Sequence, residues 1–130
     1  MIVVDASVLV TALADDSIDG HAVRNRLRGE DLYAPEIVDL EVASVLRKLA
    51  ARRSLSDNRC TQALGDLKDL RMQRVSHRGL VDRCWELRTN LTVYDAAYVA
   101  LAELLQATLL TSDERMTNAA GAKCKFELIE

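Results

Sequence analysis

Four carboxylates of the chain lie in apolar stretches, where an acid that only contacts water is not expected: Asp5, Glu41, Asp95 and Asp113. An unpaired carboxylate in apolar surroundings is costly, and it normally takes up a proton or finds a cation. Clustered carboxylates with no nearby His or Cys are hard oxygen ligands, which suit Mg²⁺ or Mn²⁺. A cation held in this way lowers the pKa of a bound water and stabilises charge on a phosphate. The four acids together therefore predict metal-dependent hydrolysis of a phosphodiester.

Two of these acids follow short apolar runs that are typical of buried strands. Asp5 is the only charged residue before Ala14 and comes directly after the β-branched run 2–4. Asp113 follows the similar run 108–112. In open parallel sheets, ligand sites form beyond the carboxyl ends of the strands. We expect both side chains to reach the same edge of one sheet.

The other two acids lie on predicted helices. Asp95 is the only ionised group in the alanine-rich stretch 91–102, which is apolar nearly all round and predicts a buried helix. Glu41 has apolar or small neighbours three and four positions away on either side, so it projects from an apolar helix face. We expect all four carboxylates to converge on one concave site.

Each acid also has a purely structural explanation. Asp5 and Asp113 could begin helices after their strands, and Thr92-x-x-Asp95 resembles a capping box. Glu41 could pair with Lys48 or Arg52 along its own helix. For any single acid this explanation weighs at least as much as the functional one. The four together favour a site, because no buried Lys or Arg is placed to neutralise them.

The elements that would position these acids alternate along the chain. Short extended runs are predicted over residues 2–4, 32–34, 72–75, 108–111 and 125–129. Helical segments are predicted over residues 8–13, 21–28, 35–53, 56–70, 77–89, 93–106 and 112–119, with Pro35 in the first turn of the third and Ser56 as the N-cap of the fourth. Strands separated by helices indicate βαβ units around a parallel sheet.

The composition indicates one globular domain, residues 1–130. The chain is 49% hydrophobic, and it has no repeat, no linker-like tract and no apolar run long enough to span a membrane. Three widely spaced cysteines suggest reduced thiols, and with no signal sequence they favour a cytoplasmic protein. The net charge of −3 excludes a basic nucleic-acid clamp, so a polyanionic substrate needs bound cations.

The residues around the acids resemble a known family. Val3-Val4-Asp5-Ala6-Ser7, Glu41 with its following apolar residues, the run Tyr94-Asp95-Ala96-Ala97-Tyr98 and the run Leu109-Leu110-Thr111-Ser112-Asp113 are similar to the PIN domain. More narrowly, they resemble the VapC ribonuclease toxins of bacterial type II toxin–antitoxin modules. The resemblance covers essentially the whole chain in order.

The resemblance implies an α/β/α sandwich with a central parallel sheet, a homodimer, and an Mg²⁺-dependent endoribonuclease in which Mn²⁺ can substitute. It also implies a VapB-type antitoxin that covers the acidic cleft, and RNA as substrate. Asp5, Glu41, Asp95 and Asp113 match the family's catalytic acids, with the metal held by Asp5, Asp95 and Asp113. Ser7 and Thr111 match hydroxyl positions that would orient the carboxylates or a bound water. Some members carry a further aspartate where this chain has Arg115 and Thr117, so a fifth acidic ligand is not expected.

Three other functions remain open on the residues alone. A PIN nuclease of RNA maturation or decay would act without an antitoxin, and an inactive PIN fold would serve as a binding module. A receiver or haloacid-type phosphatase domain is less favoured, because Asp5-Ala6-Ser7 lacks the paired acids that those domains carry after the first strand. Trp85, at helical spacing with Val81 and Arg88, is expected in core or interface packing rather than base stacking.

Overall fold

The first apolar run forms a buried strand, β1 (Ile2–Val4), at the centre of a five-stranded sheet. The computed structural model describes residues 1–129. β1 lies between β2 (Leu32–Pro35) and β4 (Thr108–Thr111), and β3 (Gln73–Val75) and β5 (Phe126–Leu128) form the two edges. Every neighbouring pair is parallel, as the alternation of strands and helices predicts.

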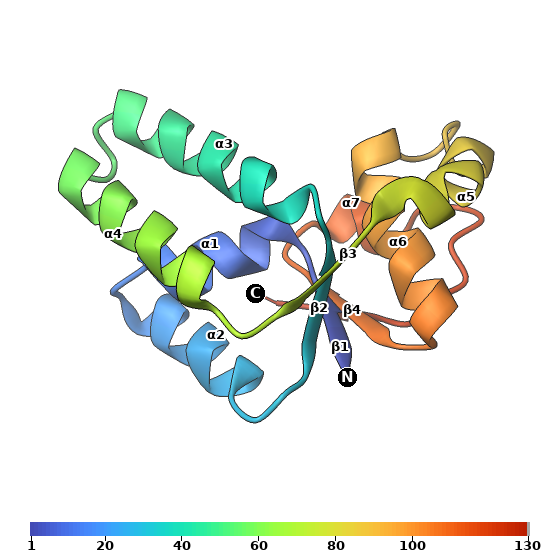
Figure 1. Cartoon of the computed structure of the whole chain (residues 1–130), viewed down its shortest axis with the longest axis horizontal. Helices are drawn as coiled ribbons and strands as arrows, with labels where there is room; N and C mark the ends of the chain where they lie inside the picture. Colours follow the sequence, from blue (N-terminus) through green and yellow to red (C-terminus); the bar gives the residue numbers. More distant parts are fainter. Residues whose placement is uncertain (130) are drawn as a thin grey trace.

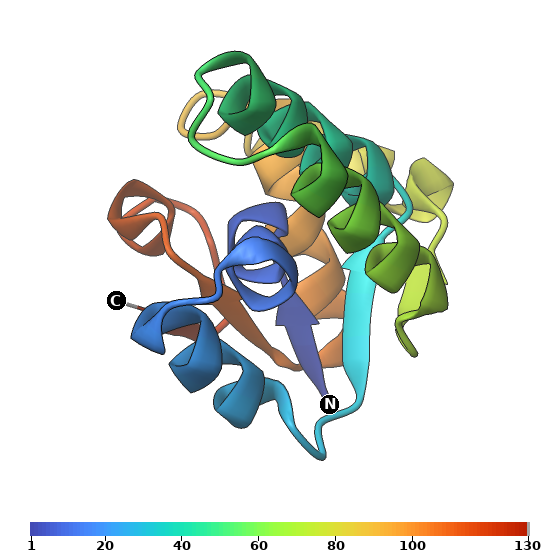
Figure 2. The same cartoon turned by 90° about the vertical axis from the view of Figure 1, so that its left-hand side faces the viewer.

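Helices cover both faces of the sheet. One layer consists of α1 (Ala6–Ala14), α2 (Ile18–Leu27), α3 (Val38–Ala51) and α4 (Asp57–Asp69). The opposite layer is made by the 3₁₀ helix η1 (His77–Leu80), α5 (Val81–Glu86) and α6 (Val93–Leu105) (Figures 1 and 2). The short α7 (Glu114–Thr117) follows β4 beside β5. The expected α/β/α sandwich with a central parallel sheet is confirmed.

The alanine-rich helix α6 forms the centre of its layer. Its residues 96–102 are all buried, and it packs against β1, β2 and β4. Small side chains let a helix approach a sheet closely, so this run is buried as the sequence predicts. Tyr98 is the largest side chain in the fully buried part of the core.

Several element boundaries differ from prediction, most clearly at Pro35 and in the segment 77–89. Pro35 is the last residue of β2 and not part of a helix, and α3 begins at Val38. A proline is tolerated there because β1 pairs with β2 only as far as Tyr33, so no ladder hydrogen bond is lost on that side. The predicted helix 77–89 is wrong as a single helix, because η1 and α5 divide it at Leu80 and α5 ends at Glu86.

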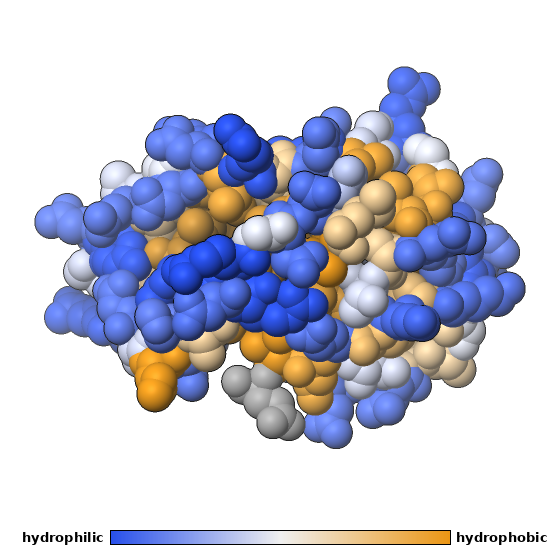
Figure 3. Space-filling view, turned by 90° about the horizontal axis from the view of Figure 1, so that it is seen from below, coloured by the Kyte–Doolittle hydropathy of each residue, from blue (hydrophilic) through white to orange (hydrophobic). Residues whose placement is uncertain are grey.

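Hydrophilic side chains cover most of the surface seen from below, with hydrophobic residues in patches between them (Figure 3). Cys60, Cys84 and Cys124 are free thiols, as expected from their spacing. Among the helices of residues 1–129, none is long and apolar enough to cross a membrane.

Candidate metal centre

The carboxyl ends of β1 and β4 bring Asp5 and Asp113 to one edge of the sheet. The two strands are neighbours, with Val4 opposite Leu110, and the Asp5 backbone N–H donates to the Leu110 carbonyl at 3.1 Å. Asp5 is the first residue after β1, and Asp113 lies two residues after the end of β4. The expected placement of both aspartates at the same edge follows directly from this pairing.

Asp5 is the most buried of the four carboxylates, at 5% exposure. One oxygen accepts from the Ser7 hydroxyl at 2.6 Å and from the Val8 backbone N–H at 3.0 Å, so Asp5 also caps α1. The other oxygen accepts from the Thr111 hydroxyl. Burial raises the Asp5 pKa above its ordinary value, although the hydrogen bonds oppose this. Ser7 and Thr111 therefore contact the carboxylate that they are expected to orient.

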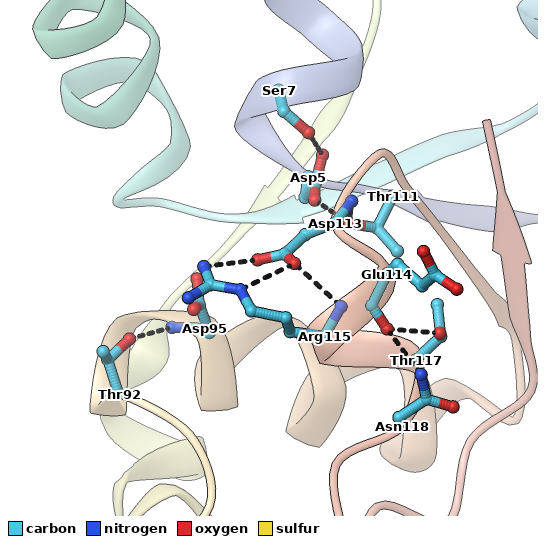
Figure 4. A network of polar contacts seen from close by, with 10 residues as sticks. All are labelled: Asp5, Ser7, Thr92, Asp95, Thr111, Asp113, Glu114, Arg115, Thr117 and Asn118. Atoms are coloured by element: carbon cyan, nitrogen blue, oxygen red, sulfur yellow. Dashed lines mark hydrogen bonds and ion pairs between the residues drawn. The ribbon is translucent and has the colours of Figure 1, made fainter. Parts of the chain in front are cut away.

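Asp113 is held by the residues that follow it. Its carboxylate accepts from the Arg115 backbone N–H at 2.9 Å, which makes it the N-cap of α7. The Arg115 guanidinium lies 3.2 Å from the same carboxylate (Figure 4), and its positive charge also acts to lower the pKa of Asp95. These bonds hold the pKa of Asp113 below its ordinary value. The hydroxyl of Thr111 accepts from the Asp113 backbone N–H at 3.0 Å, so Thr111 links Asp5 to Asp113.

Asp95 lies in the first turn of α6, half-buried at the start of the apolar run. The Thr92 hydroxyl accepts from the Asp95 backbone N–H at 3.1 Å, so Thr92 caps the helix as its spacing predicts. No reciprocal hydrogen bond from the Thr92 backbone N–H to the Asp95 carboxylate occurs among residues 1–129, so the capping box is not closed. Burial and then the charge of Asp113 raise the Asp95 pKa.

Glu41 lies in the first turn of α3 and is half-buried. Its carboxylate accepts from the Tyr98 hydroxyl at 2.5 Å, and no ion pair within the described chain joins it to Lys48 or Arg52. Burial raises the Glu41 pKa, the bond from Tyr98 lowers it, and the charges of Asp95 and Asp5 raise it again. Tyr98 was not expected at the site, because a tyrosine in an apolar run predicts core packing.

The four carboxylates share one electrostatic neighbourhood. The charge of Asp113 raises the pKa of both Asp5 and Asp95, and the charges of Asp5 and Asp95 raise that of Glu41. In the rotamers that they adopt, however, no three Asp, Glu, His or Cys side chains of residues 1–129 stand close enough to hold one ion. The carboxylates of Asp5, Glu41 and Asp113 are each held by hydrogen-bond donors of their own. Joint coordination of a cation therefore requires at least one of the four acids to change its rotamer.

The remaining candidate residues lie away from the acids or at their margin. The Trp85 side chain is 62% exposed, and the Arg88 guanidinium lies 4.2 Å from the centre of its ring. Trp85 is therefore not packed in the core, and of the two kinds of packing expected for it only interface packing is still open. Arg74 and Arg83 form ion pairs with carboxylates of the helix layers. Arg115 is the one cation that pairs with an acid of the quartet in residues 1–129.

Comparison with known proteins gives the following relatives. The sequence profile of the PIN domain family matches residues 2–122. The chain is 43% identical to ribonuclease VapC9 of Mycobacterium tuberculosis (strain H37Rv), over 99% of this chain and 98% of the relative. It is 38% identical to ribonuclease VapC1 of the same strain, over 98% of this chain and 96% of the relative.

Solved structures with a similar fold are toxin–antitoxin complexes. VapBC2 from Rickettsia felis, bound to a DNA fragment from its promoter, has a TM-score of 0.70 at 16% identity and full coverage of both chains. A toxin–antitoxin complex from Klebsiella pneumoniae has a TM-score of 0.68 at 16% identity, over 100% of this chain and 98% of the other. At this level of identity the likeness concerns the fold.

Proposed function

The chain belongs to the PIN-domain family, in its VapC ribonuclease branch, and from this premise we propose that it is the toxin of a type II toxin–antitoxin module. It hydrolyses RNA phosphodiesters with Mg²⁺ bound among Asp5, Asp95 and Asp113. The observation that carries the proposal is geometric: neighbouring parallel strands bring Asp5 and Asp113 to one edge of the sheet, where the Thr111 hydroxyl joins them. Asp95 and Glu41 lie near enough for the charges of these acids to raise their pKa values. The chain's 43% identity with a named ribonuclease supports the same reaction class.

The donor chemistry fits a hard divalent cation. All four side chains offer carboxylate oxygens, and the burial of the Asp5 carboxylate makes a positive partner favourable. Three of the four acids have raised pKa values, so in the metal-free protein the groups around their carboxylates do not fully offset the cost of burying the negative charge. Mn²⁺ can substitute, because it prefers the same oxygen ligands.

Different residues of the centre have different roles in the hydrolysis. Water is added across a phosphorus–oxygen bond, so the water oxygen bonds to phosphorus and the ester oxygen leaves with a proton. Bound Mg²⁺ supplies Lewis acidity toward the phosphate and a lowered pKa for water. Ser7 and Thr111 keep the Asp5 carboxylate in its orientation, and Glu41 adds negative charge to the centre and orients the attacking water.

The charge of the chain determines how RNA and an inhibitor would bind. With a net charge of −3 and four acids at the site, RNA is repelled unless cations are bound. A VapB-type antitoxin needs only to place a basic side chain, most simply an arginine, among the acids to replace the metal. Arg115 already makes such a contact with Asp113 from within the chain.

We also propose a homodimer that buries an apolar groove beside the acidic centre. The groove has a volume of about 270 Å³. Three of its residues, Val81, Trp85 and Tyr94, are more than half exposed in the single chain. A second copy would remove this surface from water. The groove is lined by Ile37, His77, Val81, Cys84, Trp85, Val93, Tyr94 and Ala97.

Expression in bacteria tests the proposed function. Wild type and Asp5→Ala are expressed in parallel, each with and without the gene encoded next to it, and Asp69→Ala serves as a control at an exposed acid. We expect wild type and Asp69→Ala to arrest growth alone, the neighbouring gene to relieve the arrest, and Asp5→Ala to be harmless. Arrest by Asp5→Ala would separate toxicity from the acidic centre, and arrest by no variant would favour a nuclease of RNA maturation or an inactive module.

A further inference from the structure

Tyr98 carries a hydroxyl that the core does not need. The side chain is only 1% exposed and lies on the buried face of α6. A phenylalanine would fill the same space, and a buried hydroxyl costs free energy unless it finds a partner. The hydroxyl donates to Glu41 Oε1 at 2.5 Å, across 57 residues of sequence. The Tyr98 hydroxyl therefore serves to donate this hydrogen bond to Glu41.

The bond joins the two helices that supply acids to the centre. Tyr98 lies three residues after Asp95 on α6, so the two side chains project from the same side of the helix. The Glu41 carboxylate, which comes from α3, is thus fixed against the part of α6 that carries Asp95. One Glu41 oxygen is engaged by the phenol, and Oε2 has no hydrogen bond to the described residues.

The electrostatics of Glu41 show why such a donor is useful. Burial and the charges of Asp95 and Asp5 all favour the protonated acid, and the Tyr98 hydroxyl is the group that favours the carboxylate by lowering the Glu41 pKa. A hydrogen bond to a charged group is about twice as strong as a neutral one. Without the hydroxyl, the Glu41 carboxylate would lose the one side-chain donor that it has among the described residues, and its pKa would rise.

We propose that Tyr98 is a positioning residue of the acidic centre, whose hydroxyl holds the Glu41 carboxylate in place beside Asp95 for cation binding and hydrolysis. This inference rests on the proposed function. Tyr98 acts only through Glu41, so its effect must vanish when Glu41 can no longer respond. A tyrosine that served packing alone would act independently of Glu41.

A double-mutant cycle on Mn²⁺ binding tests the inference. The proteins are wild type, Tyr98→Phe, Glu41→Gln and the double variant, titrated with Mn²⁺ by calorimetry, with thermal melts in EDTA to check folding. Tyr94→Phe is the matched control, since it removes a hydroxyl from an exposed tyrosine of the same helix. Turnover of RNA at saturating Mn²⁺ is measured on the same samples.

We expect Tyr98→Phe to weaken Mn²⁺ binding and to slow turnover by about tenfold to a hundredfold, the usual effect of losing an outer hydrogen-bond partner at a metal centre. Tyr94→Phe should match wild type, and in the Glu41→Gln background Tyr98→Phe should change either value by less than about twofold. Equal losses in both backgrounds, or no loss in Tyr98→Phe, would overturn the inference and leave the proposed function standing. Failure of wild type to bind Mn²⁺ would overturn both.

Discussion

Asp5→Asn removes the most buried charge of the acidic centre and keeps its hydrogen bonds. The Asn side-chain oxygen can still accept from the Ser7 hydroxyl and the Val8 N–H, as the Asp5 oxygen does at 2.6 Å and 3.0 Å. The amide nitrogen would face the Thr111 hydroxyl, whose oxygen can accept a hydrogen bond. The substitution therefore alters charge and metal binding, with the N-cap of α1 retained.

We expect the order of stability of the two proteins to reverse with metal. Without metal at neutral pH, wild type carries an ionised Asp5 against the burial that raises its pKa, so Asp5→Asn should melt at the higher temperature. Mg²⁺ at about 100 times its dissociation constant should stabilise wild type by about 2.7 kcal/mol. For a chain of 130 residues this raises the melting temperature by about 8 to 13 °C. The variant, which lacks a ligand, should gain little.

Thermal melts in EDTA and in a series of Mg²⁺ concentrations measure this reversal. Asp69→Asn is the control, because Asp69 is an exposed acid at the end of α4 and its loss should leave the metal response intact. A variant that is less stable than wild type in EDTA by more than about 1 kcal/mol would show that the Asp5 charge is needed for folding. A full Mg²⁺ response in Asp5→Asn would place the bound metal elsewhere.

Three further perturbations follow from the same geometry. The melting temperature of the metal-free protein should fall as the pH rises from the ordinary carboxyl values of 3.8 and 4.5 through the raised pKa values of Asp5, Asp95 and Glu41, because the stabilisation from their protonated forms is lost over that range. Saturating Mg²⁺ should remove this trend, and a trend of opposite sign would contradict the raised pKa values. Arg115→Ala should tighten Mn²⁺ binding about twofold to fivefold in calorimetry, because it removes a cation that competes for Asp113. Arg115→Lys should bind Mn²⁺ more nearly as wild type does. Weaker binding in Arg115→Ala would show that Arg115 assists the metal. Trp85→Ala should shift the dimer toward monomer in sedimentation, and an unchanged dimer would place the interface on another surface.

The fold and the four acids are readable from the sequence because each depends on local pattern. Apolar runs of three or four residues give the strands, and the alternation with helices gives a parallel sheet, so Asp5 and Asp113 are placed at one edge by topology alone. The prediction of Pro35 in a helix is wrong because the backbone conformation that proline favours is found at the start of a helix as well as at the end of a strand. Which side of β2 lacks a hydrogen-bond partner at that point depends on the tertiary pairing.

The partners of the acids are harder to predict, because they come from distant segments or from rotamers. Tyr98 looks like a core residue in its apolar helix, and its bond to Glu41 exists only once α3 and α6 are placed beside each other at the sheet edge. Arg115 is visible in the sequence as the replacement of an acid, but its contact with Asp113 depends on the turn that starts α7. The signal available for Tyr98 was its spacing of three residues from Asp95.

Cleavage of RNA by the partner-free protein is the measurement that most directly tests the acidic centre. Purified wild type and Asp95→Asn are incubated with cellular RNA in Mg²⁺, in Mn²⁺ and in EDTA, and the products are resolved on a gel. We predict cleavage by wild type with either metal and none in EDTA, and a rate at least about 100-fold lower for Asp95→Asn. Undiminished cleavage in EDTA, or by Asp95→Asn with metal, would contradict a nuclease that works through a cation held at this acidic centre.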